Sequence, residues 1–145
     1  MKPEGWAILT ALCWGVGSLL EKRGVKIGGL APAVGTLLRT GFSFLLLLAI
    51  TLPFWSQIKT AGFKSILLIA IGGGVLAGGL GIVFLYSGLK TGNLSTVMTI
   101  AFCLTPVIGA ALGILVLQEK LNLLQLLGIV LCITGSVLVI YFKKV

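Results

Sequence analysis

Residues 94–117 read LSTVMTIAFCLTPVIGAALGILVL, an apolar run that contains no charged side chain. A bilayer core about 30 Å thick is crossed by roughly 20 helical residues, each of which rises about 1.5 Å. The strands of a membrane barrel are only about 10 residues long and alternate in polarity. Because this run is longer and does not alternate, it predicts a transmembrane helix.

Four further apolar runs lie at Gly5–Leu20, Ala33–Trp55, Ile66–Leu89 and Leu121–Phe142, and only the second of these contains a charged side chain. Together with Leu94–Leu117 they predict an all-α membrane protein, a five-transmembrane-helix bundle that forms a single domain over residues 1–145. Because five is odd, we expect the two termini on opposite sides of the membrane. The loops between the runs are short, so we expect any function to lie in the membrane or at its surface.

The composition favours a membrane protein over a soluble one. Hydrophobic residues make up 58% of the chain and charged residues only 10%, too few for the surface of a soluble domain. The net charge of +8 comes from basic residues at the ends of the apolar runs, which form no stripe of the kind that binds nucleic acid. Basic residues at such places anchor helices against phosphate headgroups. We therefore expect a multi-pass protein of the cell membrane that contacts the lipid bilayer and not nucleic acid.

The residue types that support catalysis or metal binding are scarce. The chain has no histidine, and its three acids are glutamates near the ends of the runs. Its three cysteines, Cys13, Cys103 and Cys132, fall in separate runs without metal-ligand spacing. We therefore expect no enzyme activity, no metal site and no cofactor.

Basic residues are distributed almost evenly over the two sides of the membrane. If side A is the side of the N-terminus, it holds Lys2, Lys59, Lys64 and Lys120, and side B holds Lys22, Arg23, Lys26, Lys90, Lys143 and Lys144. The positive-inside rule favours side B as cytoplasmic by a narrow margin. Because so narrow a margin permits both orientations, we expect dual topology.

Arg39 lies inside the second run, roughly 10 Å along the helix from Pro32. Arginine within a span costs about 2.5–3.5 kcal/mol on insertion, so such residues usually face a cavity or a partner. Glu21, at the end of the first run, is the nearest carboxylate and a candidate for an ion pair or a coupling role. Three alternatives remain open: Arg39 attracts or gates anions, forms a structural pair with Glu21, or extends to the side B interface.

Other side chains are candidates for the lining of a substrate cavity, together with Arg39. These are Trp14, Lys22, Tyr86, Thr105 and Pro106. Proline has no amide hydrogen, so Pro106 removes one hydrogen bond from its helix, and such a kink is tolerated beside a cavity or a neighbouring helix. Each of these side chains is also able simply to pack.

Small residues recur at every fourth position in three of the runs. They are Gly74 and Gly78, then Gly109 and Gly113, then Gly128, Cys132 and Ser136. Such faces let helix backbones approach closely where lipid gives no hydrophobic drive to associate. They predict helix packing, and one of them is a candidate dimer seam.

Several short motifs follow one another in a specific order. The first half of the chain has Trp14-Gly15, Lys22, Pro32 and Arg39, and the second half has Tyr86-Ser87-Gly88-Leu89-Lys90, Leu104-Thr105-Pro106-Val107, Gln118-Glu119-Lys120-Leu121, Gln125-Leu126-Leu127-Gly128-Ile129 and Gly135-Ser136. In this order and spacing they resemble one EamA-type repeat of the drug/metabolite transporter superfamily, over nearly the whole chain. The smaller multidrug relatives carry a glutamate in the middle of their first span, where this chain has Trp14 and Gly15. That difference puts proton-coupled export of lipophilic cations in doubt.

The resemblance implies a transporter of amino acids, other metabolites or drugs. Full-length members of that family resemble two inverted five-helix repeats around a central cavity, and this chain resembles one repeat. The resemblance therefore implies that two halves pair, as an antiparallel homodimer or with a separately encoded half-repeat, and move small-molecule substrates by alternating access. The alternatives are a non-transporting membrane subunit and a channel or lipid scramblase.

Overall fold

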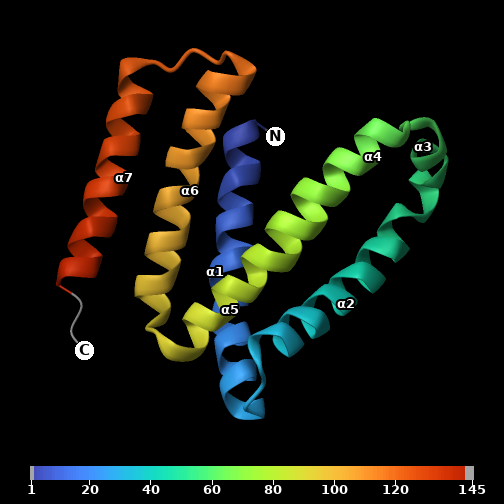
Figure 1. The fold of residues 1–145 in the computed structure, drawn as a ribbon, viewed down its shortest axis with the longest axis horizontal. Coiled ribbons are helices and arrows are strands. Elements are labelled where there is room, and N and C mark those ends of the chain that lie inside the picture. The colour runs from blue at the N-terminus through green and yellow to red at the C-terminus, as the bar shows by residue number, and fades with distance from the viewer. Residues whose placement is uncertain (1, 143–145) are drawn as a thin grey trace. The chain divides into compact units, whose positions relative to one another are not determined.

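The computed structural model describes residues 2–142, which form helices and no strand (Figure 1). They fall into two compact units, of which the first ends at Thr91 and the second begins at Gly92. The single domain expected over residues 1–145 stays a prediction. Lys143 and Lys144, which the sequence assigns to side B, lie outside the described residues.

The first unit begins with two helices joined by a tight turn. Helix α1 covers Pro3–Gly28 and α2 covers Pro32–Thr51. Gly29 ends α1 in the left-handed conformation, with φ of 58°, and the amides of Gly29 and Leu30 donate to carbonyls in the last turn of α1. Glycine adopts this conformation without the steric cost that a Cβ brings, and proline suits the first turn of the next helix.

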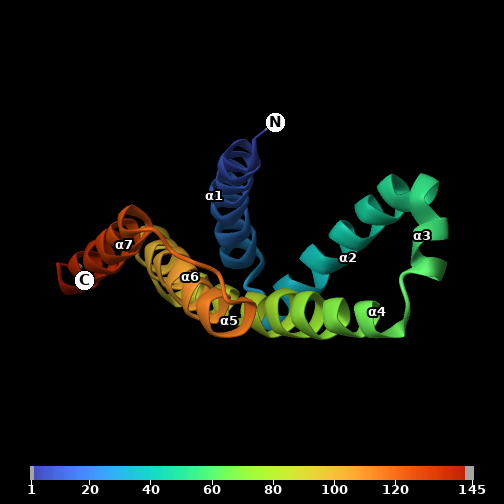
Figure 2. The same cartoon turned by 90° about the horizontal axis from the view of Figure 1, so that it is seen from above.

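The rest of the first unit is a long helical hairpin. Its elements are η1 (Leu52–Phe54), α3 (Trp55–Thr60), α4 (Phe63–Ile69), η2 (Ala70–Leu80) and α5 (Gly81–Thr91). A 3-10 turn carries Pro53 between α2 and α3, and Gly62, with φ of 74°, turns the chain into α4. The arm formed by α2 and the arm formed by α4, η2 and α5 meet at α5 and diverge toward α3 (Figures 1 and 2).

Element η2 is a π-helix of 11 residues in the glycine-rich run. A π-helix brings the carbonyl five residues back close to each position, and long π segments are rare. At Gly78 an added Cβ would lie 2.7 Å from the carbonyl oxygen of Gly73. Glycine at this position therefore suits the π geometry, which the sequence did not predict.

The core of the first unit lies where α5 packs against α1 and α2. Val25 from α1 and Ile82 and Tyr86 from α5 are buried together, with Leu85 against them. Ser18 on α1 and Thr36 on α2 are buried polar residues, and the Thr36 hydroxyl donates to the carbonyl of Pro32 at 2.9 Å. This small core holds the charged site described below.

The second unit is a helical hairpin of α6 (Leu94–Leu117) and α7 (Leu123–Tyr141), which pack side by side (Figures 1 and 2). Gln118 ends α6 in the left-handed conformation, with φ of 57°. Asn122 and Gln125 form a capping box at the start of α7, which satisfies two amides at the helix end. Among residues 92–142 the buried residues are small, namely Thr96, Gly113 and Ser136.

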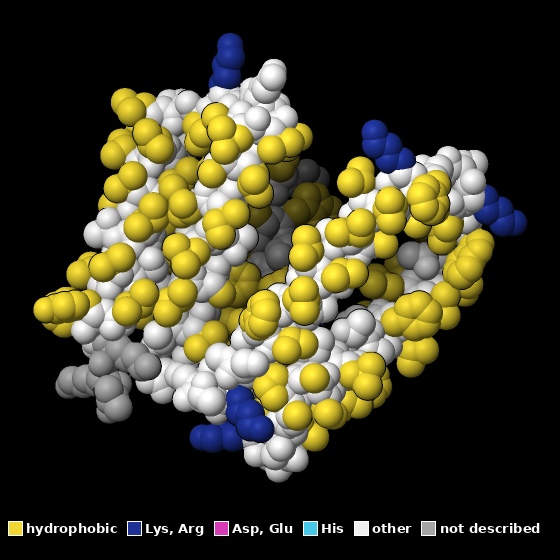
Figure 3. Space-filling model, viewed as in Figure 1, with side chains coloured by type: hydrophobic (Ala, Val, Ile, Leu, Met, Phe, Trp, Pro, Cys, Tyr) yellow, Lys and Arg dark blue, Asp and Glu magenta, His cyan; other side chains and the backbone are white. Residues whose placement is uncertain are grey.

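Among residues 2–142, four helical segments are long and apolar enough to cross a membrane. They are Pro32–Thr60, Phe63–Thr91, Leu94–Leu117 and Leu123–Tyr141. Hydrophobic side chains cover the visible outer faces of these helices, whereas basic side chains stand near helix ends (Figure 3). The protein is therefore a multi-pass helical membrane protein.

The count of five apolar spans needs correction, because α1 does not qualify. Helix α1 has 26 residues, which is long enough. Its uncharged stretch, Gly5–Leu20, is too short, because any 18 consecutive residues of α1 include at least one charged side chain. Tryptophan, glycine and serine lower the mean hydropathy of α1 further. The described part of the chain thus has five long helical segments, of which four are strongly apolar.

The small-residue faces differ in what surrounds them. Gly113 lies against Glu119, whose Oε2 would be 2.7 Å from an added Cβ, and Ser136 is buried. An added Cβ would meet nothing within 4 Å at Gly74, Gly109 and Gly128. The latter three positions are open, and their predicted role in a dimer seam stays a prediction.

Candidate functional site

An ion pair joins α1 to α2 inside the first unit. The Nε of Arg39 donates to Oε1 of Glu21 at 2.9 Å. The two side chains are 30% and 21% exposed, so the pair is shielded without being enclosed. The pair with Glu21 is one of the three alternatives that the sequence left open, and the role of Arg39 in attracting or gating anions stays a prediction.

Trp14 adds a second contact to the same arginine. The guanidinium carbon of Arg39 lies 5.8 Å from the centre of the Trp14 ring, within the range of a cation–π interaction. Trp14 and Glu21 are two turns of α1 apart, so both project toward Arg39 from one face of that helix. A cavity of about 70 Å³ lies among Trp14, Ser18, Glu21 and Arg39.

Tyr86 brings α5 into the site. Its side chain is buried, and it interacts with both Glu21 and Arg39. The ring lies against Gly35 of α2, where an added Cβ would be 2.6 Å from Cε1 and 2.7 Å from Cδ1 of Tyr86. Gly35 is therefore the residue that lets the aromatic ring approach the α2 backbone.

A cavity of about 580 Å³ opens beside these side chains, and Glu21, Arg39 and Tyr86 all line it. Its volume lies within the usual range of small-molecule sites. Apart from the charged pair, its walls are mainly glycine, leucine and aromatic residues. The arrangement offers one negative and one positive group, side by side, to a molecule in an otherwise apolar cavity.

Sequence reasoning missed several lining residues that a spacing rule finds. On α1 these are Gly17 and Gly24, and on α2 they are Gly35, Phe42 and Ser43. Gly17 and Gly24 stand four residues before and three residues after Glu21, and Gly35 and Phe42 stand in the same way around Arg39. Such steps place residues on one helix face, so the signal was present in the spacing.

Two lysines lie at the side B end of the first unit. Lys90 donates from Nζ to the carbonyl oxygen of Leu30 at 3.0 Å, which ties α5 to the turn between α1 and α2. Lys22 follows Glu21 but lines neither of these two cavities. Its predicted place in the substrate cavity stays a prediction.

Thr105 and Pro106 belong to α6, in the second unit. The Thr105 hydroxyl donates to the carbonyl oxygen of Ala101 at 2.7 Å, so it bonds to its own helix. Pro106 lies within α6, which continues to Leu117. The structure therefore gathers Trp14, Glu21, Arg39 and Tyr86 in one place, and the cavity role of Thr105 and Pro106 stays a prediction.

Among residues 2–142, no group of three or more histidine, cysteine or acidic side chains is arranged to hold a metal ion. The three cysteines are free thiols.

The fold and the site together define a class: a multi-pass helical membrane protein with a charged cavity among its helices. Residues 1–141 match the EamA-like transporter family. The chain therefore belongs to the EamA-like transporter family, whose members are membrane transporters and not enzymes, and it corresponds to one EamA repeat. No curated protein and no solved structure matches it significantly.

Proposed function

We propose that this protein transports a small zwitterionic metabolite, such as an amino acid, across the cell membrane. The observation that carries the proposal is the Arg39–Glu21 pair on the wall of a cavity of about 580 Å³. An ionisable group within membrane helices is costly, and such groups usually mark a substrate or ion pathway. Family membership supports transport as the activity.

The charge balance of the cavity favours a zwitterion over a simple anion. The Arg39 guanidinium has further donors besides the Nε bonded to Glu21, and these suit a carboxylate. The Glu21 carboxylate has a second oxygen, which suits an ammonium group. A molecule that carries both groups matches both partners and leaves no charge uncompensated. A simple anion, in contrast, offers no positive group to the Glu21 carboxylate and is repelled by it.

The complete path is proposed to need a second repeat, supplied by an antiparallel copy of this chain. Three observations support this arrangement: the near-even charge of the two sides, the open faces at Gly109 and Gly128, and the inverted repeats typical of such transporters. Rocking of the two halves about the cavity would then give alternating access.

Uptake by purified protein in liposomes tests the proposed activity. A carrier gives saturable uptake of neutral amino acids and counterflow, in which unlabelled substrate inside drives labelled substrate in. Unsaturable flux would instead support a channel or scramblase. No flux, together with a stable foreign partner, would support the non-transporting subunit.

Reporter fusions at each terminus test the antiparallel pair. A reporter that is active on only one side of the membrane should give signal at both termini in a population of dual topology. If every molecule has its N-terminus on one side, the antiparallel homodimer fails, and a separately encoded half-repeat takes its place.

A further inference from the structure

A second cavity lies at the other end of the hairpin, where its arms diverge toward α3. It has a volume of about 500 Å³, and it shares no lining residue with the cavity around Arg39. Phe54, Ile58, Ile66 and Ile69 form its apolar walls. Gln57 and Ser65 add polar groups to the lining.

The end of the hairpin beside this cavity is basic. Lys59 follows the lining residue Ile58 in the sequence, and Lys64 precedes the lining residue Ser65, although neither lysine itself lines the cavity. Both lysines are exposed. Residues 40–118 contain no aspartate or glutamate, so the sequence around the lysines offers no carboxylate to neutralise them.

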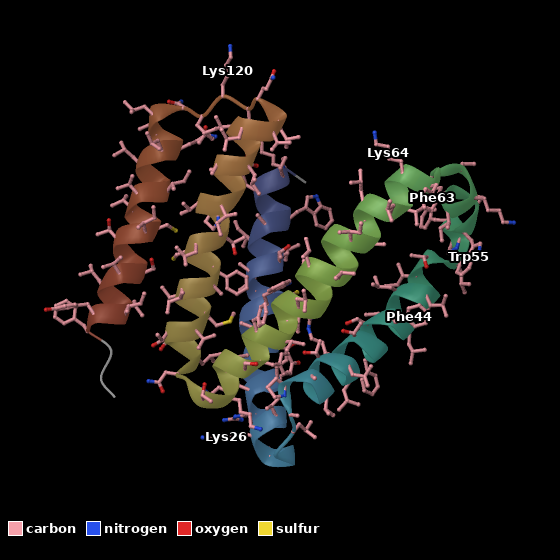
Figure 4. All side chains as sticks on the ribbon, in the orientation of Figure 1. Lys26, Phe44, Trp55, Phe63, Lys64 and Lys120 are labelled. Carbon is pink, nitrogen blue, oxygen red and sulfur yellow. The ribbon has the colours of Figure 1, made fainter. Side chains whose placement is uncertain are left out.

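Aromatic side chains mark the depth of this end in a membrane. Trp55, Phe63 and Lys64 stand together at the α3–α4 end of the hairpin (Figure 4). Tryptophan and lysine at a helix end are typical of the boundary between acyl chains and headgroups. We therefore expect the cavity to lie just below the level of the lipid headgroups.

We propose that this cavity binds one anionic phospholipid, with an acyl chain between the two arms and the phosphate near Lys59 and Lys64. The apolar walls match the chain, and the two positive charges match the headgroup. A neutral phospholipid matches only the walls. This site does not depend on the proposed transport activity, because none of its residues belongs to the Arg39 cavity.

Native mass spectrometry of the delipidated full chain in detergent tests the site. Dioleoylphosphatidylglycerol should bind roughly tenfold more tightly than dioleoylphosphatidylcholine, because each basic residue near an anionic surface contributes measurably to binding. The double variant Lys59→Gln/Lys64→Gln should lose this preference. The matched control Lys120→Gln, in the turn between α6 and α7, should keep it.

A second variant tests the apolar part of the site. Ala70 lines the cavity, so Ala70→Phe should fill it and weaken the binding of both lipids. Circular dichroism checks that Ala70→Phe keeps its helices. If this variant does not fold, the double variant of the exposed lysines still tests the proposal.

Four results would overturn the proposal. Equal affinity of the wild-type protein for the two lipids would show that the cavity does not recognise the anionic headgroup. An equal loss of preference in Lys120→Gln would assign the effect to overall charge. Unchanged lipid binding by a folded Ala70→Phe variant would place the lipid elsewhere, and displacement of the lipid by inorganic phosphate at equal concentration would replace the lipid with a free anion.

Discussion

The two units have similar apolar helices but bury different residues. The first unit surrounds an ion pair with aromatic side chains, and its core contains Val25, Ile82 and Tyr86. The second unit buries the small residues Thr96, Gly113 and Ser136 between two helices. Its single acid, Glu119, lies in the turn between α6 and α7 and not in a helix.

This difference shows that hydropathy alone does not distinguish helices that carry a candidate functional site from helices that only pack. Both units supply spans of high hydropathy, and only the position of a few charged residues separates them. Charge within a span must be compensated, so it forces a specific local arrangement, whereas small residues only permit close approach. We therefore expect mutations to have larger effects at the site of the first unit than at the hairpin of the second.

The largest effect should come from breaking the Glu21–Arg39 pair. Replacement of either residue by alanine leaves the other charge unpaired, and we expect a loss of about 3 kcal/mol in the free energy of unfolding. Unfolding in detergent micelles measures this loss. The double alanine variant should lose much less than the sum of the two single variants, because the residues are coupled.

Arg23→Ala is the matched control for this pair. Arg23 is an exposed basic residue near the same end of α1, and its removal should change the free energy of unfolding by about 0.5 kcal/mol or less. The account is contradicted if the losses in unfolding free energy of the two single variants add up to that of the double variant. It is also contradicted if Arg23→Ala loses as much stability as either single variant.

The contact of Tyr86 with α2 should give the next largest effect. In Gly35→Ala the new methyl group meets the Tyr86 ring at 2.6 Å and Val25 Cγ2 at 3.2 Å, so the buried ring must move. We expect a loss of about 2 kcal/mol, typical of an overpacked core. Gly41→Ala, in the same helix with open space, should not destabilise the protein, and equal losses in the two variants would contradict the contact.

Within the hairpin of the first unit, the π-helix η2 allows a comparison of two glycines, Gly78 and Gly74. A methyl group at Gly78 would lie 2.7 Å from the carbonyl oxygen of Gly73, whereas one at Gly74 meets nothing within 4 Å. Gly78→Ala should therefore cost about 1.5 kcal/mol, or convert part of η2 to an α-helix, and Gly74→Ala should do neither. Amide hydrogen exchange along η2 measures the change. Identical exchange in the two variants would argue against the π segment.

The smallest effect is expected at the start of α7, in the second unit. Asn122→Ala removes the capping box and should cost about 1 kcal/mol. Asn93 is the matched control, because it precedes α6 without a side-chain capping bond. Thermal unfolding of both variants compares them, and a larger loss from Asn93→Ala would reverse the assignment of the caps.

Much of this architecture follows from the sequence. The run Leu94–Leu117 coincides with α6, and the other strongly apolar runs overlap three further helical spans. The helix predicted at Gly5–Leu20 is present as α1, but it does not count as a strongly apolar span, because the run is short and borders on charged residues. The π-helix was not predicted, since hydropathy carries no information on whether a glycine-rich run forms α or π turns.

The charged pair was partly predictable. The cost of arginine in a span indicated that Arg39 needs a partner, and Glu21 was the nearest carboxylate. The contact of Tyr86 with Gly35 joins helices far apart in the chain, and no local pattern encodes it. Helical spacing relates residues within one helix only, so the sequence pattern does not tell whether residues of the second unit, such as Thr105, belong to this site.

The most direct test of the central claim is amino acid uptake by the double variant Glu21→Gln/Arg39→Gln in liposomes. Removal of both charges leaves no unpaired charge, so we expect the variant to fold and insert as the wild-type protein does. The account predicts that saturable counterflow of neutral amino acids then falls at least about tenfold, because the groups that match the carboxylate and the ammonium are gone. Counterflow at the wild-type rate by the folded double variant would contradict it.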